Sequence, residues 1–259
     1  MPLKEISPLR KHIQIYSMLA KPTGGKTVKS RAISLMGADF GIARITTSEM
    51  IMWNIERKTA LGTEYEKYLE GMKARQLVPC HLVLPGLADA VIRTHQQGFS
   101  KIIIDGSPRS EIQAKALVNC RVDFQLFEID ISDEEAVRRD AERRKFETRL
   151  DDGQILGGLK TYRDQTAPGI RLTKKAGLYH RIDGTRSIRS QIAKILREFR
   201  FKDHEFKTMM RKLDDANHPA TVIVDEAEGR RKREEKPAYS PRRRNFWDQA
   251  ESHQMAATA

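Results

Sequence analysis

The chain has 259 residues, of which 39% are hydrophobic, so it is long enough for one large domain or for one domain with an extension. No apolar run reaches the roughly 18 residues that a membrane-spanning helix needs, and the first residues lack the apolar stretch of a secretory signal. The two cysteines, Cys80 and Cys120, form no C-x-x-C pair. This argues against a zinc site and a disulfide scaffold, and it favours a reducing cytoplasm.

The formal net charge is +12, and residues 1–200 carry 35 of the 47 basic and 24 of the 35 acidic side chains. The positive excess therefore belongs mainly to the part of the chain that we expect to fold. A basic domain attracts polyanions such as nucleotides, nucleic acids or acidic membrane surfaces. Composition alone does not choose among these partners.

Short apolar runs and longer helical patterns alternate along the chain. The runs predict strands at about 12–19, 42–46, 101–105, 124–131 and 179–182. The helical patterns are at about 26–37, 48–58, 61–76, 82–97, 110–118, 132–145, 159–166 and 187–200. Because strands alternate with helices, we predict the α/β fold class, with a parallel sheet covered by helices on both faces.

The pattern weakens after about residue 203. A short helix is expected at 204–213, and "ATVIV" (220–224) is a candidate for an extra strand. From about residue 225 the chain is polar and is expected to be mostly disordered. Residues 230–244 hold eight Lys or Arg, which could bind nucleic acid or a membrane surface, but no recognisable nucleic-acid module is present and a solvated tail is favoured.

Residues 20–27 read AKPTGGKT, close to the phosphate-loop pattern G-x-x-x-x-G-K-[S/T]. Gly25, Lys26 and Thr27 match, but Ala20 replaces the first glycine, which is unfavourable if that position needs a positive φ. A strand before the motif, a helix after it, and Asp105 at the end of another strand supply the context of such a loop. The alternative is an ordinary surface turn before a helix.

In a phosphate loop, successive backbone N–H groups, here from about Gly24 to Val28, converge on phosphate at a helix N-terminus. Lys26 would reach the β- and γ-phosphates, and Thr27 could be a ligand of Mg²⁺.

Further segments match one family in order and spacing. They are "ITTSEM" (45–50), "IIIDGSPRSEIQA" (102–114), the pair Arg139 and Arg143, "TRLDDG" (148–153), "TYRDQTAP" (161–168) and "YHRIDGT" (179–185). Over about residues 12–200 the chain thereby resembles the nucleoside monophosphate kinases, and adenylate kinases in particular.

The resemblance implies a P-loop NTPase fold, a three-layer α/β/α core within residues 1–203. A helical arm that binds the monophosphate is expected at about 47–81, and a lid over ATP at about 143–153. Five residues separate Arg143 from Arg149, which implies a short lid without room for zinc. Residues 204–259 would be a C-terminal extension.

The implied activity is transfer of the γ-phosphoryl group of ATP to AMP, giving two ADP, with Mg²⁺, in a cytoplasmic monomer. ATP is the co-substrate. The alternative is a catalytically weak or inactive nucleotide-binding homologue, tethered to nucleic acid by its basic tail.

The resemblance also implies the site residues. The catalytic cations would be Lys26, Arg109, Arg143 and Arg149. ATP would be bound by Gly24, Gly25, Lys26, Thr27, Val28, Arg139, Arg143 and Arg186. AMP would be bound by Thr47, Val78, Gly106, Arg109 and Gln113. Mg²⁺ would be held, partly through water, by Thr27, Asp105 and Glu49, and the lid acids would be Asp151 and Asp152.

Each of these residues also has a plain structural interpretation. Arg139 and Arg143 could be solvated partners of acids on their own helix. Thr47 could cap the helix that follows it, and Asp105 could cap the next turn. Asp151 and Asp152 could belong to an ordinary turn before Gly153.

The chain departs from the family pattern at several positions. Met52 stands where the family has an arginine that grips the monophosphate, and Gly158 lies near the place of a second arginine beside the lid. Ser107 replaces an aromatic residue, and "LVPCH", with Cys80, replaces L-V-P-D-E. The arginines that could substitute for the missing ones are Arg57, Arg75 and Arg163. These departures lead us to expect reduced turnover or an altered acceptor.

Overall fold

The structure is a computed structural model that describes residues 3–74, 76–148, 152–199 and 201–232. Its strands form a five-stranded sheet in the order β2-β3-β1-β4-β5, and all neighbouring strands are parallel. The strands are β1 (Gln14–Ala20), β2 (Ile42–Thr46), β3 (Lys101–Asp105), β4 (Asp123–Asp130) and β5 (Tyr179–Asp183). Each lies within two residues of its predicted bounds.

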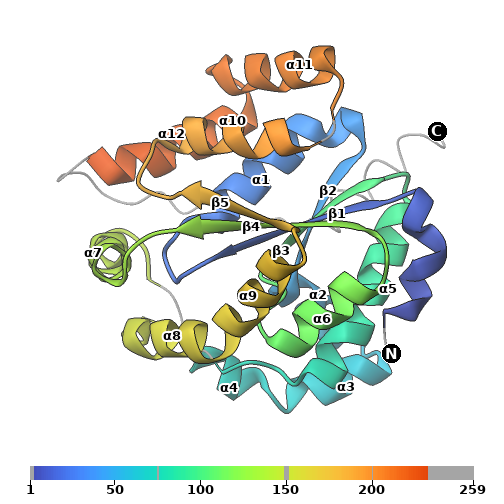
Figure 1. The fold of residues 1–259 in the computed structure, drawn as a ribbon. Coiled ribbons are helices and arrows are strands. Elements are labelled where there is room, and N and C mark those ends of the chain that lie inside the picture. Colours follow the sequence, from blue (N-terminus) through green and yellow to red (C-terminus); the bar gives the residue numbers. More distant parts are fainter. Residues whose placement is uncertain (1–2, 75, 149–151, 200, 233–259) are drawn as a thin grey trace.

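Helices cover both faces of this sheet (Figure 1). One face carries α5 (Cys80–Gln96), α6 (Glu111–Asn119), α9 (Ala167–Lys175) and the short 3-10 helix η1 (Lys4–Lys11). The other carries α1 (Lys26–Gly37), α10 (Ile188–Glu198), α11 (Asp203–Asp214) and α12 (Pro219–Lys232). The 3-10 turn η2 (Ala38–Phe40) joins α1 to β2. The predicted fold class, a three-layer α/β arrangement with a parallel sheet, is confirmed.

Strands β1, β2 and β3 bury both of their faces, whereas the edge strand β5 is partly exposed. Consecutive side chains of a strand point to opposite sides of the sheet. In β1, Ile15 and Leu19 belong to one apolar cluster, and Tyr16 and Met18 belong to the other. Strands covered on both sides read as nearly continuous apolar runs, which is why the sequence located them well.

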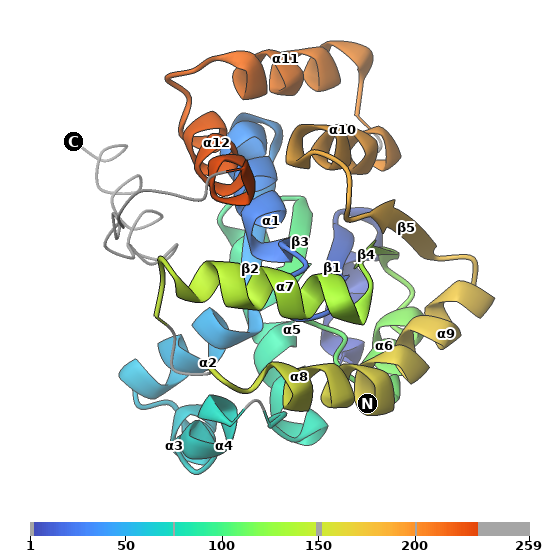
Figure 2. The same ribbon diagram turned by 90° about the vertical axis from the view of Figure 1, so that its left-hand side faces the viewer.

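Helices at the carboxyl ends of the strands surround the region where a ligand would bind in such a fold. The helices α2 (Thr47–Glu56), α3 (Ala60–Glu66) and α4 (Leu69–Lys73) follow β2. The helices α7 (Asp133–Arg144) and α8 (Ile155–Thr161) follow β4, and Figure 2 shows α7 lying across the end of the sheet. Side-chain caps fix where three of these helices begin, and one of them is Thr59, which accepts the N–H of Gly62 at the start of α3. The Thr46 hydroxyl accepts the N–H of Glu49 at 2.9 Å, and the Ser132 hydroxyl accepts that of Glu135 at 3.1 Å.

The extra strand considered at 220–224 is wrong, because these residues lie in α12. Ala220 and Val224 are four positions apart, both are fully buried, and both join the cluster under α1. The Thr221 hydroxyl donates to the carbonyl of Leu213 at 2.9 Å. A run of β-branched residues therefore forms a helix, since tertiary packing overrides its local preference.

The C-terminal extension is ordered further than expected. The polar tail predicted from about residue 225 is incorrect for residues 225–232, which continue α12 along α1 in both views (Figures 1 and 2). Residues Met209 and Leu213 of α11 are fully buried in the same cluster. The predicted short helix at 204–213 is confirmed as α11, and the division of the chain at residue 203 stays a prediction.

Two other expected helices differ in extent. The helix expected at 61–76 is divided into α3 and α4, each of which holds one of the glycines Gly62 and Gly71, and glycine lowers the stability of a long helix. The helix expected at 159–166 extends in both directions, through α8, a π-helical turn η3 (Tyr162–Thr166) and α9. Pro168 does not stop it, because proline is tolerated in the first turn of α9.

Several predictions lie outside the described residues: Arg75, the lid residues Arg149 and Asp151, and the basic tail beyond residue 232. Within the ranges that the structure describes, no helix is both long and apolar enough to cross a membrane. The bounds of the arm and of the lid remain predictions.

Candidate functional site

The segment between β1 and α1 forms the predicted loop, with Gly25 as the N-cap of α1 at φ 80° and Lys26 as its first residue. Ala20 is the last residue of β1 and does not adopt a positive φ, so the cost expected at this position is absent. Thr23 adopts the left-handed conformation instead, at φ 63°. The residue of the loop that carries backbone strain is therefore Thr23.

Ala20 and Gly24 fit each other closely. A Cβ atom added at Gly24 would lie 2.5 Å from the Cβ of Ala20 and 3.1 Å from the carbonyl oxygen of Lys21. The methyl group of Ala20 thus occupies the space that a side chain at position 24 would need. Replacement of the family's first glycine by alanine is accommodated because position 24 is glycine.

Two contacts tie the loop to α7. The hydroxyl of Thr23 donates to the carbonyl of Ala136 at 2.8 Å, and the ammonium of Lys21 lies 2.7 Å from a carboxylate oxygen of Asp133. The hydrogen bond offsets part of the strain at Thr23, because strained backbone persists where its surroundings hold it in place. The loop and α7 therefore form one connected unit.

An ion pair between Lys26 and the buried carboxylate of Asp105 joins the loop to β3. The Nζ of Lys26 lies 2.7 Å from Oδ1 of Asp105 and 3.4 Å from Oγ1 of Thr27. Burial alone would raise the pKa of Asp105. The charges of Lys26 and Arg44, with hydrogen bonds from Lys26 and Thr27, outweigh burial and lower that pKa to about 2. Asp105 is therefore ionised at neutral pH, and it does not serve as a plain turn cap.

Arg44 is a member of this cluster that the sequence did not reveal. It lies in β2 and is 8% exposed. Its guanidinium donates to Oγ of Ser30 at 3.0 Å and to Oδ2 of Asp105 at 3.3 Å, and it lies 3.5 Å from a carboxylate oxygen of Glu49. It thus connects the two acids predicted for Mg²⁺. The partners that define its role are distant in sequence, so no local pattern could have found it.

Lys29 is a second cation that the sequence did not indicate. It is fully buried in the first turns of α1, and its Nζ donates to the carbonyl of Gly25 at 3.0 Å. A second, longer contact of 3.4 Å reaches the carbonyl of Gly24. Its ammonium therefore lies directly beneath the backbone of the loop.

Both predicted arginines of α7 are largely buried, so the interpretation as solvated surface partners is wrong. Arg139 is 9% exposed, donates to Glu135 at 2.6 Å and reaches the carbonyl of Gly184 at 2.8 Å. Arg143 donates to Asp140 at 2.9 Å and forms an ion pair with Asp152. Arg139 links α7 to the turn after β5, and Arg143 links it to the predicted lid.

Gln113 holds the turn that follows β3. Its side-chain oxygen accepts the hydroxyl of Ser107 at 3.0 Å and the backbone N–H of Arg109 at 2.7 Å. Its amide nitrogen lies 3.7 Å from the sulfur of Cys80, close to Val78, which is buried. These contacts join two of the residues predicted for the monophosphate, Gln113 on α6 and Arg109 in the turn after β3, and they place Cys80, the first residue of α5, beside Gln113. The hydrogen bond from its N–H fixes the backbone of Arg109 within this turn.

Thr47 is not the cap of α2, because Thr46 performs that role. The hydroxyl oxygen of Thr47 is buried and has no hydrogen-bond partner among the described residues. A Cβ atom at Gly106 would lie 3.7 Å from this oxygen, so Thr47 and Gly106 are neighbours. A buried hydroxyl without a partner is rare in proteins and marks Thr47 as a candidate ligand contact.

Two of the arginines suggested as substitutes for the missing ones, Arg57 and Arg163, lie within the described residues. Both have other partners. Met52 exposes 39% of its apolar side chain, and Gly158 is buried in α8. The guanidinium of Arg57 lies over the ring of Trp53, 5.0 Å from its centroid, and that of Arg163 is paired with Asp133 at 2.5 Å. Arg186 is near the turn after β5 and lies 3.3 Å from Asp183.

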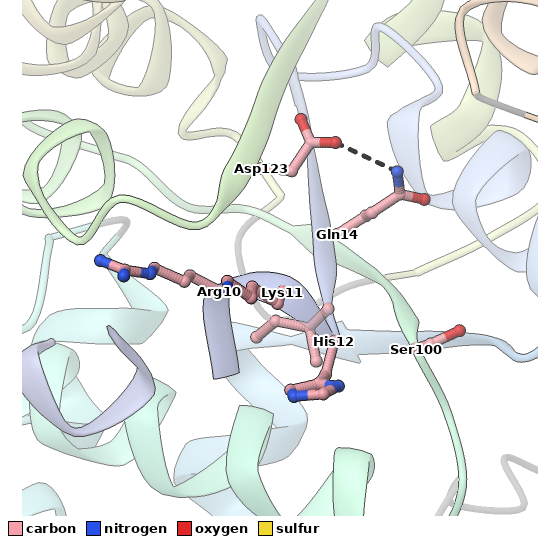
Figure 3. Close-up of a pocket in the computed structure, with 7 residues that line it drawn as sticks. Arg10, Lys11, His12, Gln14, Ser100 and Asp123 are labelled. Atoms are coloured by element: carbon pink, nitrogen blue, oxygen red, sulfur yellow. Dashed lines mark hydrogen bonds between the residues drawn. The ribbon is translucent and has the colours of Figure 1, made fainter. Parts of the chain in front are cut away.

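A shallow hollow of about 310 Å³ lies at the opposite end of the sheet, where β1 begins. Figure 3 shows Gln14 and Asp123 joined by their hydrogen bond there, while the side chains of Arg10 and His12 point in different directions. The charged groups do not converge on one point. The candidate site is therefore at the carboxyl ends of the strands.

Comparison with curated proteins gives one consistent result, although no protein-family model matches the chain. The chain is 30% identical to the adenylate kinase of Leptospira biflexa over 178 residues, which cover 66% of this chain and 91% of that protein. It is 29% identical to that of Methanothrix thermoacetophila, covering 70% and 98% of the two chains. It is 36% identical to that of Mycolicibacterium paratuberculosis over 155 residues, covering 58% and 81%.

Proposed function

This chain belongs to the adenylate kinase family, and from that premise we propose that it transfers the γ-phosphoryl group of ATP to AMP. In this reaction an oxygen of the AMP phosphate attacks the γ-phosphorus, the bond to the β–γ bridging oxygen breaks, and both products are ADP. Such a transfer depends on positioning and on neutralising charge, with little covalent chemistry by the protein.

The observation that carries the proposal is the arrangement of Lys26 at the N-terminus of α1. Its ammonium lies 2.7 Å from Oδ1 of the buried Asp105 and 3.4 Å from Oγ1 of Thr27. A helix N-terminus with a lysine at its first position binds phosphate through backbone N–H groups and a positive side chain. Lys26 would exchange its contact with Asp105 for the β- and γ-phosphates. We call Lys26, Thr27 and Asp105, with Lys29 and Arg44, the loop side of the site.

Mg²⁺ would enter with ATP, and the chain's oxygen donors fit it. The hydroxyl of Thr27 and the carboxylate of Asp105 are neighbours, and both already contact one cation, the ammonium of Lys26. Hydroxyl and carboxylate oxygens are the ligands that Mg²⁺ prefers. Thr27 and Asp105 would hold the ion, directly or through water, and Glu49 would act through water. Bound Mg²⁺ would neutralise phosphate charge.

The residues around the turn after β3 support AMP as acceptor. We propose that Thr47 and Gln113 contact the adenine, with Val78 and Gly106 beside it, and that Arg109 holds the monophosphate. The buried hydroxyl of Thr47, without a partner among the described residues, supports this assignment. We call these residues, with Met52, the acceptor side.

The arginines of α7 complete the proposed site. Arg139 would lie against the base of ATP, near Arg186, because it reaches the carbonyl of Gly184 in the turn after β5. Arg143 would bind the transferring phosphate, and its pairing with Asp152 would hold it toward the lid. Arg149 and Asp151 are proposed partners there by resemblance alone.

An initial-rate assay that follows ADP formation, with AMP, CMP, UMP and GMP as acceptors, tests the proposal. We expect turnover with AMP to exceed turnover with the other three acceptors. Turnover at background with every acceptor would refute the proposal. A different preferred acceptor would keep the phosphotransfer and refute the assignment of AMP. The cytoplasmic location and the monomeric state stay predictions.

A second candidate is a nucleotide-binding protein with little turnover. The observation that favours it is Met52, an apolar and 39% exposed side chain at the place of a phosphate-gripping arginine. Calorimetry that shows tight ATP binding together with negligible turnover would support this candidate. Comparing a protein that ends at residue 232 with the full chain in a nucleic-acid titration tests the tether, and equal weak binding by both would count against it.

A further inference from the structure

Two buried cations of the loop side, Lys29 beside the loop backbone and Arg44 beside Asp105, have been given no role in nucleotide binding so far. Lys29 is 0% exposed and Arg44 is 8% exposed. Buried charges are costly unless they are well bonded, so a chain that keeps two of them at one place retains them against an energetic penalty. Their position therefore needs an explanation.

Both side chains are held firmly next to the loop. Lys29 donates to the carbonyls of Gly25 and Gly24, at 3.0 and 3.4 Å. Arg44 donates to Ser30, the residue after Lys29, and to the Oδ2 of Asp105. Lys26 contacts the other oxygen of Asp105, Oδ1. Lys26 and Arg44 therefore bind different oxygens of the same carboxylate.

The charge balance around the loop depends on these two residues. Lys26 and Arg44 both pair with Asp105, and Arg44 also lies near Glu49, whereas Lys29 contacts the carbonyls of the loop. When Lys26 turns to phosphate, Arg44 still neutralises Asp105 and lies 3.5 Å from Glu49. Lys29 adds positive charge below the backbone that would face phosphate. In a buried environment such charges act strongly, because solvent screens them little.

We propose that Lys29 and Arg44 are positioning residues that act as fixed counter-charges beneath the phosphate loop, so that nucleotide phosphate binds with a reduced dependence on Mg²⁺. The inference rests on the proposed function, since it concerns the same loop. The inference also offers a reason for the departures from the family pattern at Met52 and near Gly158. Met52 and Gly158 are uncharged where the family has arginines. In this chain Lys29 and Arg44 supply buried positive charge near the loop instead.

The experiment measures the dissociation constant of a non-hydrolysable ATP analogue by calorimetry, once with Mg²⁺ and once with EDTA. The readout is the ratio of the two constants. A metal-free triphosphate carries more negative charge than its Mg²⁺ complex, so loss of a fixed cation weakens the metal-free form more. In Lys29→Gln and Arg44→Gln we expect the EDTA-to-Mg²⁺ ratio to rise about tenfold over that of the full-length parent chain.

The variants separate charge from structure. Glutamine keeps a hydrogen-bond donor for the carbonyl of Gly25 or for Ser30, and Arg44→Lys keeps the charge, so its ratio should stay at the parent value. Arg197→Gln removes an exposed arginine on α10 and serves as the control. A purely structural role would lower the melting temperature and leave the ratio unchanged. The inference would be overturned if the EDTA-to-Mg²⁺ ratio of both glutamine variants, or of the one that folds, equals that of the parent chain. A parent chain that does not bind the analogue would instead refute the proposed function.

Discussion

On the loop side, Lys26 forms a 2.7 Å ion pair with the buried carboxylate of Asp105, whereas Met52 on the acceptor side is apolar and 39% exposed. The loop side holds its charges before any ligand arrives, through Arg44 and Lys29. The acceptor side uses Gln113 to hold its own turn and leaves the Thr47 hydroxyl without a partner among the described residues. Under the proposed function, ATP would bind to a side that the fold prepares, and the acceptor side would be the variable part of the site.

The largest effect is expected on the loop side, when Lys26 is replaced. We expect Lys26→Met to lower the rate of phosphoryl transfer by about 10²–10³-fold, as does the loss of one group that stabilises transition-state charge. The affinity for AMP should stay close to that of the parent. Initial rates and calorimetry measure the two effects. A rate within about threefold of the parent would contradict the role given to Lys26.

The close fit of Ala20 and Gly24 predicts a destabilising substitution with a matched rescue. Gly24→Ala places a methyl group where the Cβ of Ala20 lies 2.5 Å away, and we expect a loss of about 1–3 kcal/mol in the free energy of unfolding. The double variant Ala20→Gly/Gly24→Ala should recover most of the loss, because the new methyl group at position 24 then occupies the space left by the methyl group of Ala20. Urea unfolding measures both. Additive losses in the double variant would show that the two residues do not share this space.

The depressed pKa of Asp105 predicts how stability depends on pH. Its pKa is about 2 in the folded chain and 3.8 without its surroundings, so its contribution is present above about pH 4. That contribution is lost as the pH falls toward 2 and is on the order of 2 kcal/mol. Compared with the parent, Asp105→Asn should lose less stability between pH 4 and pH 2. Parallel unfolding curves of the two proteins across this range would contradict the prediction.

Restoring the arginine on the acceptor side should reduce the contrast between the two sides. We expect Met52→Arg to raise kcat/KM for AMP about tenfold, because a charge-assisted hydrogen bond to phosphate contributes about 1.5–3 kcal/mol. The KM for ATP should not change. Met52→Leu is the control, since it keeps an apolar side chain of similar volume. If the arginine and leucine variants behave alike, Met52 is not the weak point of the acceptor side.

Much of the fold could be predicted because β1, β2 and β3 are buried on both faces and several helices start at side-chain caps. The runs at 101–105 and 42–46 are found at the expected residues, and Ser132 caps α7 as its sequence indicates. The segment 220–224 could not be predicted from local preference. Its β-branched residues form a helix because α1 and α11 provide a surface that buries Ala220 and Val224.

The site could be predicted where one motif holds the chemistry, as for Lys26 and Thr27. Arg44 could not, because its hydrogen-bond partners Ser30 and Asp105 are 14 and 61 residues away in sequence. The positive φ of Thr23 could not be predicted either, since threonine rarely adopts it. It is held by a hydrogen bond to Ala136, 113 residues further along the chain.

The central claim is that one chain binds ATP on the loop side and AMP on the acceptor side. A calorimetric titration with two adenosines linked by five phosphates tests it most directly, because this ligand occupies both sides at once. We predict binding with a stoichiometry of one, at least tenfold tighter than either ATP or AMP alone, since linking two ligands adds their binding energies. An affinity no greater than that for ATP alone would contradict the claim, because it would show that no acceptor side lies within reach of the loop.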